Sequence, residues 1–173
     1  MGPDPLDGIS AYECSAGGID HLHFLTYGYT SLYYDEESIG GDFSRFGFET
    51  TFRLASPLPP TEDPIWVCNL LQSMARYVFE SGRWFKPYHW IAANGPIRTE
   101  ENTDIVGLVL LLDPTFAPIY SPHGRVEFLQ AFGITQSELN AIQEKTRTPQ
   151  ELVEFHRQTN PLLITELSRQ DGE

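Results

Sequence analysis

The most regular pattern of apolar and polar positions in this chain runs from Phe46 to Leu54. One set of alternate positions holds Phe46, Phe48, Thr50, Phe52 and Leu54, and the other holds Gly47, Glu49, Thr51 and Arg53. Because successive strand residues point to opposite faces, this period of two predicts a β-strand. We expect one face of the strand in the core and the other against solvent or a partner.

Three further segments are predicted as strands. The stretch from His21 to Tyr34 is dense in residues that favour strands. The unbroken apolar run Ile105–Leu112 predicts a central strand buried on both faces, and Asp113 with Pro114 ends it. Arg125–Phe132 has a mixed pattern and is the last strand candidate.

Helical periodicity begins after Asp63, which is placed to cap a helix with Pro64 at its first position. The apolar stripe of this helix consists of Trp66, Val67, Leu70, Leu71, Met74, Tyr77 and Val78. Gly82 is a natural terminator. Two capping boxes, Thr135 with Glu138 and Thr148 with Glu151, predict two later helices. Residues 162–167 are expected to form a short helix or strand.

Strands first and helices last, without regular alternation, predict the α+β class. We expect a mixed or largely antiparallel β-sheet packed against helices in one compact domain. The first residues carry prolines and several glycines, so residues 1–19 are expected to be a loose N-terminal arm, and residues 20–173 the domain.

The charge balance changes the functional picture. The chain has 24 acidic and 11 basic residues, which gives −13 with neutral histidines. Such a surface repels phosphate backbones and anionic lipid, so nucleic-acid and membrane roles are disfavoured. It favours encounter with a basic protein partner, although acidity can also serve solubility alone. Cys14 and Cys68 form no metal-ligand pattern, and without an export signal they indicate reduced thiols and a cytoplasmic location.

Two groups of carboxylates are candidate partner-binding residues. The first group is Asp35, Glu36 and Glu37, and the second is Glu100, Glu101 and Asp104. Both groups fall in segments expected to be exposed loops, where carboxylates stay ionised. They are therefore interpreted as a solvated surface or as contacts for a basic partner, rather than as a catalytic acid and base.

No local signature in the sequence supports a catalytic site, and no cofactor is expected. The chain has neither a phosphate-binding glycine loop nor a Gly-x-Ser-x-Gly nucleophile elbow. His21 and His23 are two apart on a predicted strand, so both imidazoles could reach one metal ion, but nothing fixes a third ligand. A metal-dependent enzyme centred on this pair is the alternative hypothesis.

A segment rich in aromatic residues follows the first predicted helix. Trp84, Phe85, Tyr88 and Trp90 with Arg83 nearby are the residue types that dominate protein interfaces. They are equally ordinary core residues, and most of them are expected in the core.

Several motifs, taken in order, resemble the suppressor-of-fused family. The most specific is Phe46–Leu54, and the others are His21–His23, Tyr27–Gly28, Leu32–Tyr33, Ala75–Ser81, Asn94–Ile97, Asp113–Pro114, Pro122–Gln130, Gly133–Thr135 and Leu162–Arg169. The likeness covers about residues 20–169 and corresponds to the N-terminal lobe of the animal members.

The resemblance implies binding rather than catalysis. Animal members of this family are cytoplasmic regulators that capture a peptide of Gli-type transcription factors between two lobes as an added strand. Short single-domain members are bacterial, and many are regarded as immunity proteins that neutralise a cognate toxin. The hypothesis is therefore a non-catalytic protein-binding domain, an immunity-type inhibitor of a basic toxin domain. A regulatory or scaffolding domain is the remaining alternative.

Overall fold

The computed structural model describes residues 4–31 and 33–172. The first three residues of the expected arm and Leu32 lie outside the described residues. The strands of the described part are β1 (Gly8–Ala16), β2 (Ile19–Tyr27), β3 (Phe43–Ala55), β4 (Trp90–Ala92), β5 (Ile105–Leu112), β6 (Ile119–Ser121) and β7 (Gly124–Thr135). Its helices are α1 (Ile65–Ser81), α2 (Gln136–Gln143), α3 (Pro149–Arg157) and the short 3-10 helix η1 (Glu36–Ser38).

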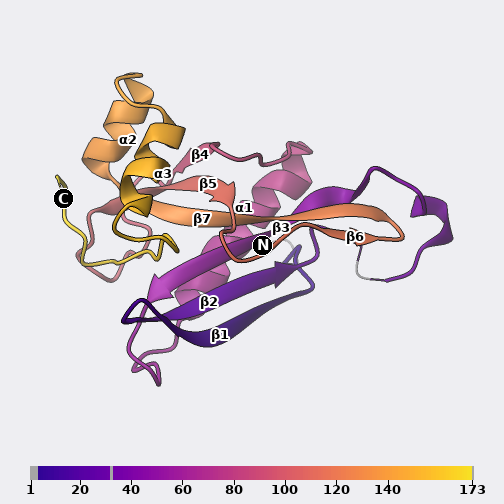
Figure 1. The fold of residues 1–173 in the computed structure, drawn as a ribbon, viewed down its shortest axis with the longest axis horizontal. Coiled ribbons are helices and arrows are strands. Elements are labelled where there is room, and N and C mark those ends of the chain that lie inside the picture. Colours follow the sequence, from indigo (N-terminus) through magenta and orange to yellow (C-terminus); the bar gives the residue numbers. More distant parts are fainter. Residues whose placement is uncertain (1–3, 32, 173) are drawn as a thin grey trace.

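The seven strands form one mixed sheet in the order β1-β2-β3-β7-β5-β4, with β6 paired to β7 (Figure 1). The central pair β3–β7 is parallel, and the other pairs are antiparallel. The expected α+β class, with a mixed sheet packed against helices, is confirmed. None of the helices in the described residues is long and apolar enough to cross a membrane.

Helices cover the two faces of the sheet unequally. Helix α1 lies along one face, where its Leu71 and Val78 pack in a core with Phe52 of β3. On the other face α2 and α3 cover β5 and the end of β7, with Leu139 and Leu152 in a second core. Strand β5 supplies alternate residues to both cores, so its predicted burial on both faces is confirmed. The predicted central position is not, because β5 lies next to the edge strand β4.

The helix signals in the sequence are largely confirmed. Gly82 ends α1 in the left-handed conformation with φ 67°. Both capping boxes, at Thr135 and Thr148, are formed. Helix α1 begins one residue later than predicted, at Ile65, whose backbone N–H donates to the Asp63 side chain.

The expectation of a loose arm over residues 1–19 is wrong for residues 8–16, which form strand β1. This strand pairs with β2 along its whole length, from Gly8 opposite Tyr27 to Ala16 opposite Ile19. Gly17 and Gly18 both have positive φ, at 61° and 79°, and join the two strands in a tight turn. Two glycines at this place are thus a hairpin signal rather than a sign of looseness.

The second face of β3 is buried rather than wet. Arg53 is 1% exposed, and Glu49 and Thr51 are also buried. The segment that follows β5 covers this face, and its Asp113 accepts hydrogen bonds from Arg53 and Thr51. The chain near Thr165 also contacts this face.

Residues 162–167, expected as a short helix or strand, form neither. A single bridge joins Thr165 to Leu54.

Candidate functional site

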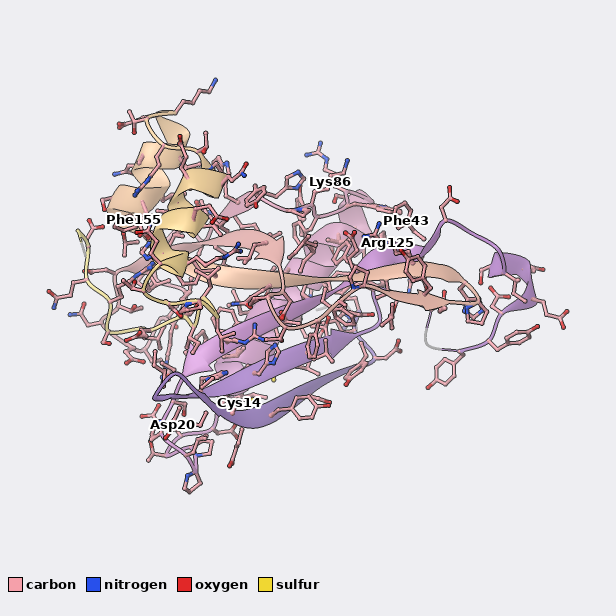
Figure 2. The ribbon with its side chains drawn as sticks, in the orientation of Figure 1. Cys14, Asp20, Phe43, Lys86, Arg125 and Phe155 are labelled. Atoms are coloured by element: carbon pink, nitrogen blue, oxygen red, sulfur yellow. The ribbon has the colours of Figure 1, made fainter. Side chains whose placement is uncertain are left out.

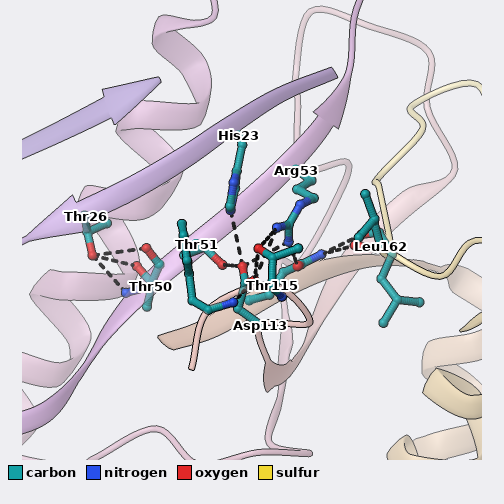
Figure 3. Close-up of polar contacts among 11 residues, drawn as sticks. His23, Thr26, Thr50, Thr51, Arg53, Asp113, Thr115 and Leu162 are labelled. Atoms are coloured by element: carbon teal, nitrogen blue, oxygen red, sulfur yellow. Dashed lines mark hydrogen bonds and ion pairs between the residues drawn. The ribbon is translucent and has the colours of Figure 1, made fainter. Parts of the chain in front are cut away.

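A buried polar cluster surrounds Asp113 at the end of β5 (Figure 3). Arg53 Nη1 donates to Asp113 Oδ2 at 2.9 Å, and Thr51 Oγ1 donates to the same oxygen at 2.6 Å. His23 Nε2 lies 3.2 Å from it. The other oxygen, Oδ1, accepts bonds from Arg53 and from the backbone and hydroxyl of Thr115. The cluster joins β2, β3 and the loop after β5.

The cluster continues to the C-terminal segment through Gln130 of β7. Arg53 Nη1 donates to the Gln130 side-chain oxygen. The Gln130 Nε2 group donates to the backbone oxygens of Leu162 at 2.9 Å and Leu163 at 2.7 Å. The cluster therefore connects β2, β3, the loop after β5, β7 and the C-terminal segment.

This cluster has the chemistry of a structural site. Burial by itself raises the pKa of the Asp113 carboxyl, but hydrogen bonds from His23, Arg53 and Thr51 outweigh it and hold the pKa well below its usual range. The carboxylate is ionised, fully enclosed and bonded on both oxygens. It therefore has no free lone pair with which to accept a proton from a substrate.

His21 and His23 do not converge on a common ligand site. His23 lies against Asp113 and stacks on Phe116, with ring centroids 5.2 Å apart. The Nδ1 atom of His21 lies 3.1 Å from the backbone oxygen of Ile19, and burial lowers the pKa of this histidine. Across residues 4–31 and 33–172, no three His, Cys, Asp or Glu side chains gather in a way that could hold a metal ion. Cys14 and Cys68 are free thiols.

The first acidic group lies at one end of the molecule. Asp35, Glu36 and Glu37 are exposed, and Asp35 Oδ1 accepts the backbone N–H of Glu37 at 3.2 Å. The backbone N–H of Asp35 donates to Nε2 of buried His123, in the turn between β6 and β7, at 3.0 Å. This bond attaches the segment that carries η1 to the β6–β7 hairpin (Figure 1).

The second acidic group lies at the opposite end (Figure 1). Glu101 pairs with Arg98 at 2.7 Å, and Asp104 accepts the backbone N–H of Asp171 at 3.0 Å. Glu100 is exposed. The six predicted carboxylates are therefore exposed, as expected, but they do not form one surface.

Sequence reasoning did not identify a groove of about 830 Å³ between α1, the loop that follows it, and β4. Its lining includes Met74 and Tyr77 from α1, Leu108 from β5, the loop residues Trp84 and Tyr88, and Trp90 at the start of β4. The prediction that most of the aromatic segment is core is wrong, because Phe85 is buried but Trp84 and Trp90 are 39% and 40% exposed. The abundance of aromatic residues was the signal in the sequence that could have indicated the groove. Their exposure could not be predicted, because it depends on how β4 pairs with β5.

Strand β4 gives this groove a free backbone edge. It pairs with β5 on one side, and no described strand pairs with its other side. Tyr88 just before β4 and Asn94 just after it have positive φ, at 67° and 58°. A left-handed conformation is strained for a tyrosine, and such strain is concentrated at functional sites in proteins.

Comparison with known proteins gives the family. Residues 2–170 match the sequence model described as Suppressor of fused protein (SUFU). This chain belongs to the suppressor-of-fused family. The human Suppressor of fused homolog is 36% identical over 180 residues, which cover 97% of this chain and 37% of the human protein. This suppressor-of-fused chain thus spans well under half the length of that relative.

Solved structures of the family have the same fold. One described as the Sufu-Fu complex aligns with a TM-score of 0.86 and 28% identity, covering 98% of this chain and 78% of the other. A putative SUFU homolog from Neisseria gonorrhoeae aligns with a TM-score of 0.54 and 15% identity, over 95% of this chain and 87% of the other, and shares the fold. The resemblance to the suppressor-of-fused family predicted from sequence motifs is confirmed.

The cluster around Asp113 gives a stability prediction. Replacing Arg53 with methionine keeps most of the side-chain volume but leaves a buried carboxylate without its cation, so we expect a loss of about 3–5 kcal/mol in the free energy of unfolding. The matched control is Arg157→Met, which removes the exposed ion pair with Glu154 and should cost less than about 1 kcal/mol. Urea unfolding followed by circular dichroism measures both. Equal losses in the two variants would contradict the structural role of Arg53.

The same cluster predicts a pH dependence. Since the pKa of Asp113 is lowered by folding, its contribution to stability is present above the unfolded value of about 3.9 and is lost as the pH falls below it. Asp113→Asn should therefore be less stable than the parent protein at neutral pH, and the difference should shrink below about pH 4. Urea midpoints measured across pH check this. Asp20→Asn, an exposed carboxylate on β2 (Figure 2), is the control. A difference that stays constant with pH would count against the assignment.

Proposed function

We propose that this suppressor-of-fused chain is a non-catalytic domain that acts by stoichiometric binding of another protein. The observation that carries the proposal is the η1–hairpin surface, which consists of Tyr33, Tyr34, Asp35, Glu36, Glu37 and Tyr120. Its three tyrosines are 80%, 68% and 79% exposed. Exposed aromatic rings beside carboxylates combine contact area with charge, which is typical of binding surfaces.

The η1–hairpin surface is preorganised for binding. His123 lies beneath it, accepts the backbone N–H of Asp35 and contacts the ring of Tyr34, with centroids 6.0 Å apart. The backbone N–H of Gly40 donates to Pro122 at 3.1 Å and adds a second connection to the hairpin. A loop fixed at two points loses less conformational freedom on binding than a free one.

The partner that fits this surface is basic. Within the described residues, Asp35, Glu36 and Glu37 take part in no ion pair, and the whole chain carries a net charge of −13. Proteins that act on nucleic acids have basic surfaces because their substrate is polyanionic. The finer proposal is an immunity-type inhibitor that neutralises a basic toxin domain in the cytoplasm. A binding role is supported by the relative whose structure was solved as the Sufu-Fu complex.

A second binding mode within the same class is strand addition at β4. The free edge of this strand offers unpaired backbone groups, and the adjacent groove can receive side chains of an added extended segment. This mode does not require the η1–hairpin surface, so one domain can use both.

Affinity capture tests the proposal directly. With the folded chain as bait in a lysate of the source organism, we expect one stoichiometric protein partner whose binding domain is basic. Mass spectrometry identifies it, and reconstitution from purified components checks the stoichiometry. A large multi-component assembly would favour the scaffolding alternative. Failure to retain any specific protein, with folded and abundant bait, would contradict the binding proposal.

Association kinetics with that partner test the role of charge. Asp35→Asn combined with Glu36→Gln and Glu37→Gln should lower the association rate about tenfold at low salt and remove most of its salt dependence, while the dissociation rate changes less. The control replaces Glu13, Glu80 and Glu144 with glutamine, which removes the same charge from exposed positions elsewhere. Equal effects of the two triple variants in stopped-flow measurements would assign steering to net charge and not to this surface.

A further inference from the structure

The segment that carries η1, residues 33–41, is attached to the β6–β7 hairpin through its backbone (Figure 1). The N–H of Asp35 donates to His123 Nε2 at 3.0 Å, and the N–H of Gly40 donates to the Pro122 oxygen at 3.1 Å. At Gly124, which has φ 117°, a Cβ atom would lie 2.5 Å from the backbone oxygen of Gly41. The two backbones are therefore in direct contact, and η1 lies between the bonds made by Asp35 and Gly40.

His123 differs from the Pro122 oxygen in that its capacity to accept depends on pH. A backbone N–H can only donate, so His123 Nε2 accepts with its lone pair, and the ring proton is on Nδ1. Imidazole changes its charge between about pH 5 and 8, and the charged ring has an N–H on both nitrogens. Uptake of a proton by His123 therefore places two donors against each other and breaks the bond to Asp35.

The surroundings of His123 make the loss of this bond consequential. The side chain is 5% exposed, and its ring contacts the ring of Tyr34. The backbone N–H of His123 donates to Ser121 Oγ at 3.2 Å, and that hydroxyl donates to the Gly124 oxygen at 3.0 Å, so the turn itself is fixed. Because the ring is enclosed, water does not readily replace the lost acceptor, and an enclosed donor without an acceptor is costly.

The charged side chains on the elements next to His123 are mostly acidic. On the segment from Tyr34 to the start of β3, and on β7, they are Asp35, Glu36, Glu37, Asp42, Arg125 and Glu127. Arg125 pairs with Glu127 at 2.8 Å, and the nearby Arg45 of β3 lies over the ring of Phe79. Carboxyl groups ordinarily titrate near pH 4 and the phenols of tyrosines near pH 10, so the imidazole is the group here that changes charge between about pH 5 and 8. A charged imidazole would lie among carboxylates.

We infer that His123 is a pH-sensitive switch for the η1–hairpin surface, in which the neutral imidazole holds residues 33–41 against the hairpin and uptake of a proton releases them. This inference rests on the binding role proposed above for that surface and names its regulation. The bond to Asp35 requires the neutral ring, so the organised surface is present above the pH at which His123 titrates and is lost as the pH falls through it. A released surface must be ordered again on binding, which weakens the affinity for a basic partner.

NMR spectroscopy of the protein alone tests the chemistry of the switch. At about pH 8 we expect His123 in the Nδ1–H tautomer, with its ring signals assigned by their absence from His123→Gln. At about pH 5.5 the ring should be doubly protonated. Exchange of the Asp35 amide hydrogen, corrected for its intrinsic pH dependence, should then be at least about fivefold faster, which is the effect of losing one hydrogen bond. An Nε2–H tautomer at the higher pH, or a neutral ring at the lower pH, would overturn the inference.

A glutamate-specific protease measures release of the segment itself. Its target bonds follow Glu36 and Glu37, which are exposed on η1. Lowering the pH from about 8 to about 5.5 should raise cleavage of these bonds at least about fivefold relative to His123→Gln, whose amide oxygen accepts a hydrogen bond at either pH. This comparison also cancels the pH dependence of the protease. The matched control, His89→Gln, removes an exposed imidazole from a different loop and should keep the response of the parent protein.

The outcomes separate the switch from the binding role beneath it. Equal pH responses of the parent protein and His123→Gln, together with unchanged exchange at Asp35, would overturn the switch, while the binding role stands or fails by affinity capture. The NMR criteria use the parent protein, so they hold whether or not glutamine reproduces the bond. If the segment is released at low pH but the captured partner binds equally well at both pH values, the regulatory role is overturned.

Discussion

The ion pair between Arg53 and Asp113 is the constraint on which the rest of this structure depends. Arg53 lies in the middle of the sheet on β3, where its guanidinium is almost completely enclosed. A buried guanidinium needs a carboxylate and further acceptors, and these come from the end of β5 and from Gln130. Satisfying them brings the C-terminal segment onto the sheet. The polar face of β3 is thereby buried. A partner protein can therefore bind only at the edges of the sheet, at the ends of the molecule or in the groove.

Local signals in the sequence predicted much of the fold. The alternation in β3, the apolar stripe of α1 with Gly82 at its end, and the two capping boxes each lie within a few consecutive residues, and each was confirmed. The predictions that failed depend on distant parts of the chain. Strand β1 forms because it pairs with β2. The second face of β3 is buried because Arg53 pairs with Asp113, which is 60 positions away in the sequence.

The same distinction applies to the candidate site. Exposure of the acidic loops followed from composition, and Asp35, Glu36 and Glu37 are exposed. Their separation from Glu100, Glu101 and Asp104 could not be predicted, because the order of strands sets it. The groove was missed for a related reason. Trp84 and Trp90 are residue types that are common in cores. They line the groove because β4 is at the edge of the sheet.

The parallel pair at the centre of the sheet has a consequence for synthesis on the ribosome. Strand β3 ends at Ala55, yet its partner β7 begins only at Gly124. While the intervening chain is made, β1, β2 and β3 can pair, but the inner edge of β3 stays open and offers backbone groups to other nascent chains. Closing this edge requires a contact between distant residues, which is slow to form. Nascent chains that stall before residue 124 therefore carry an exposed apolar edge of the kind that chaperones protect.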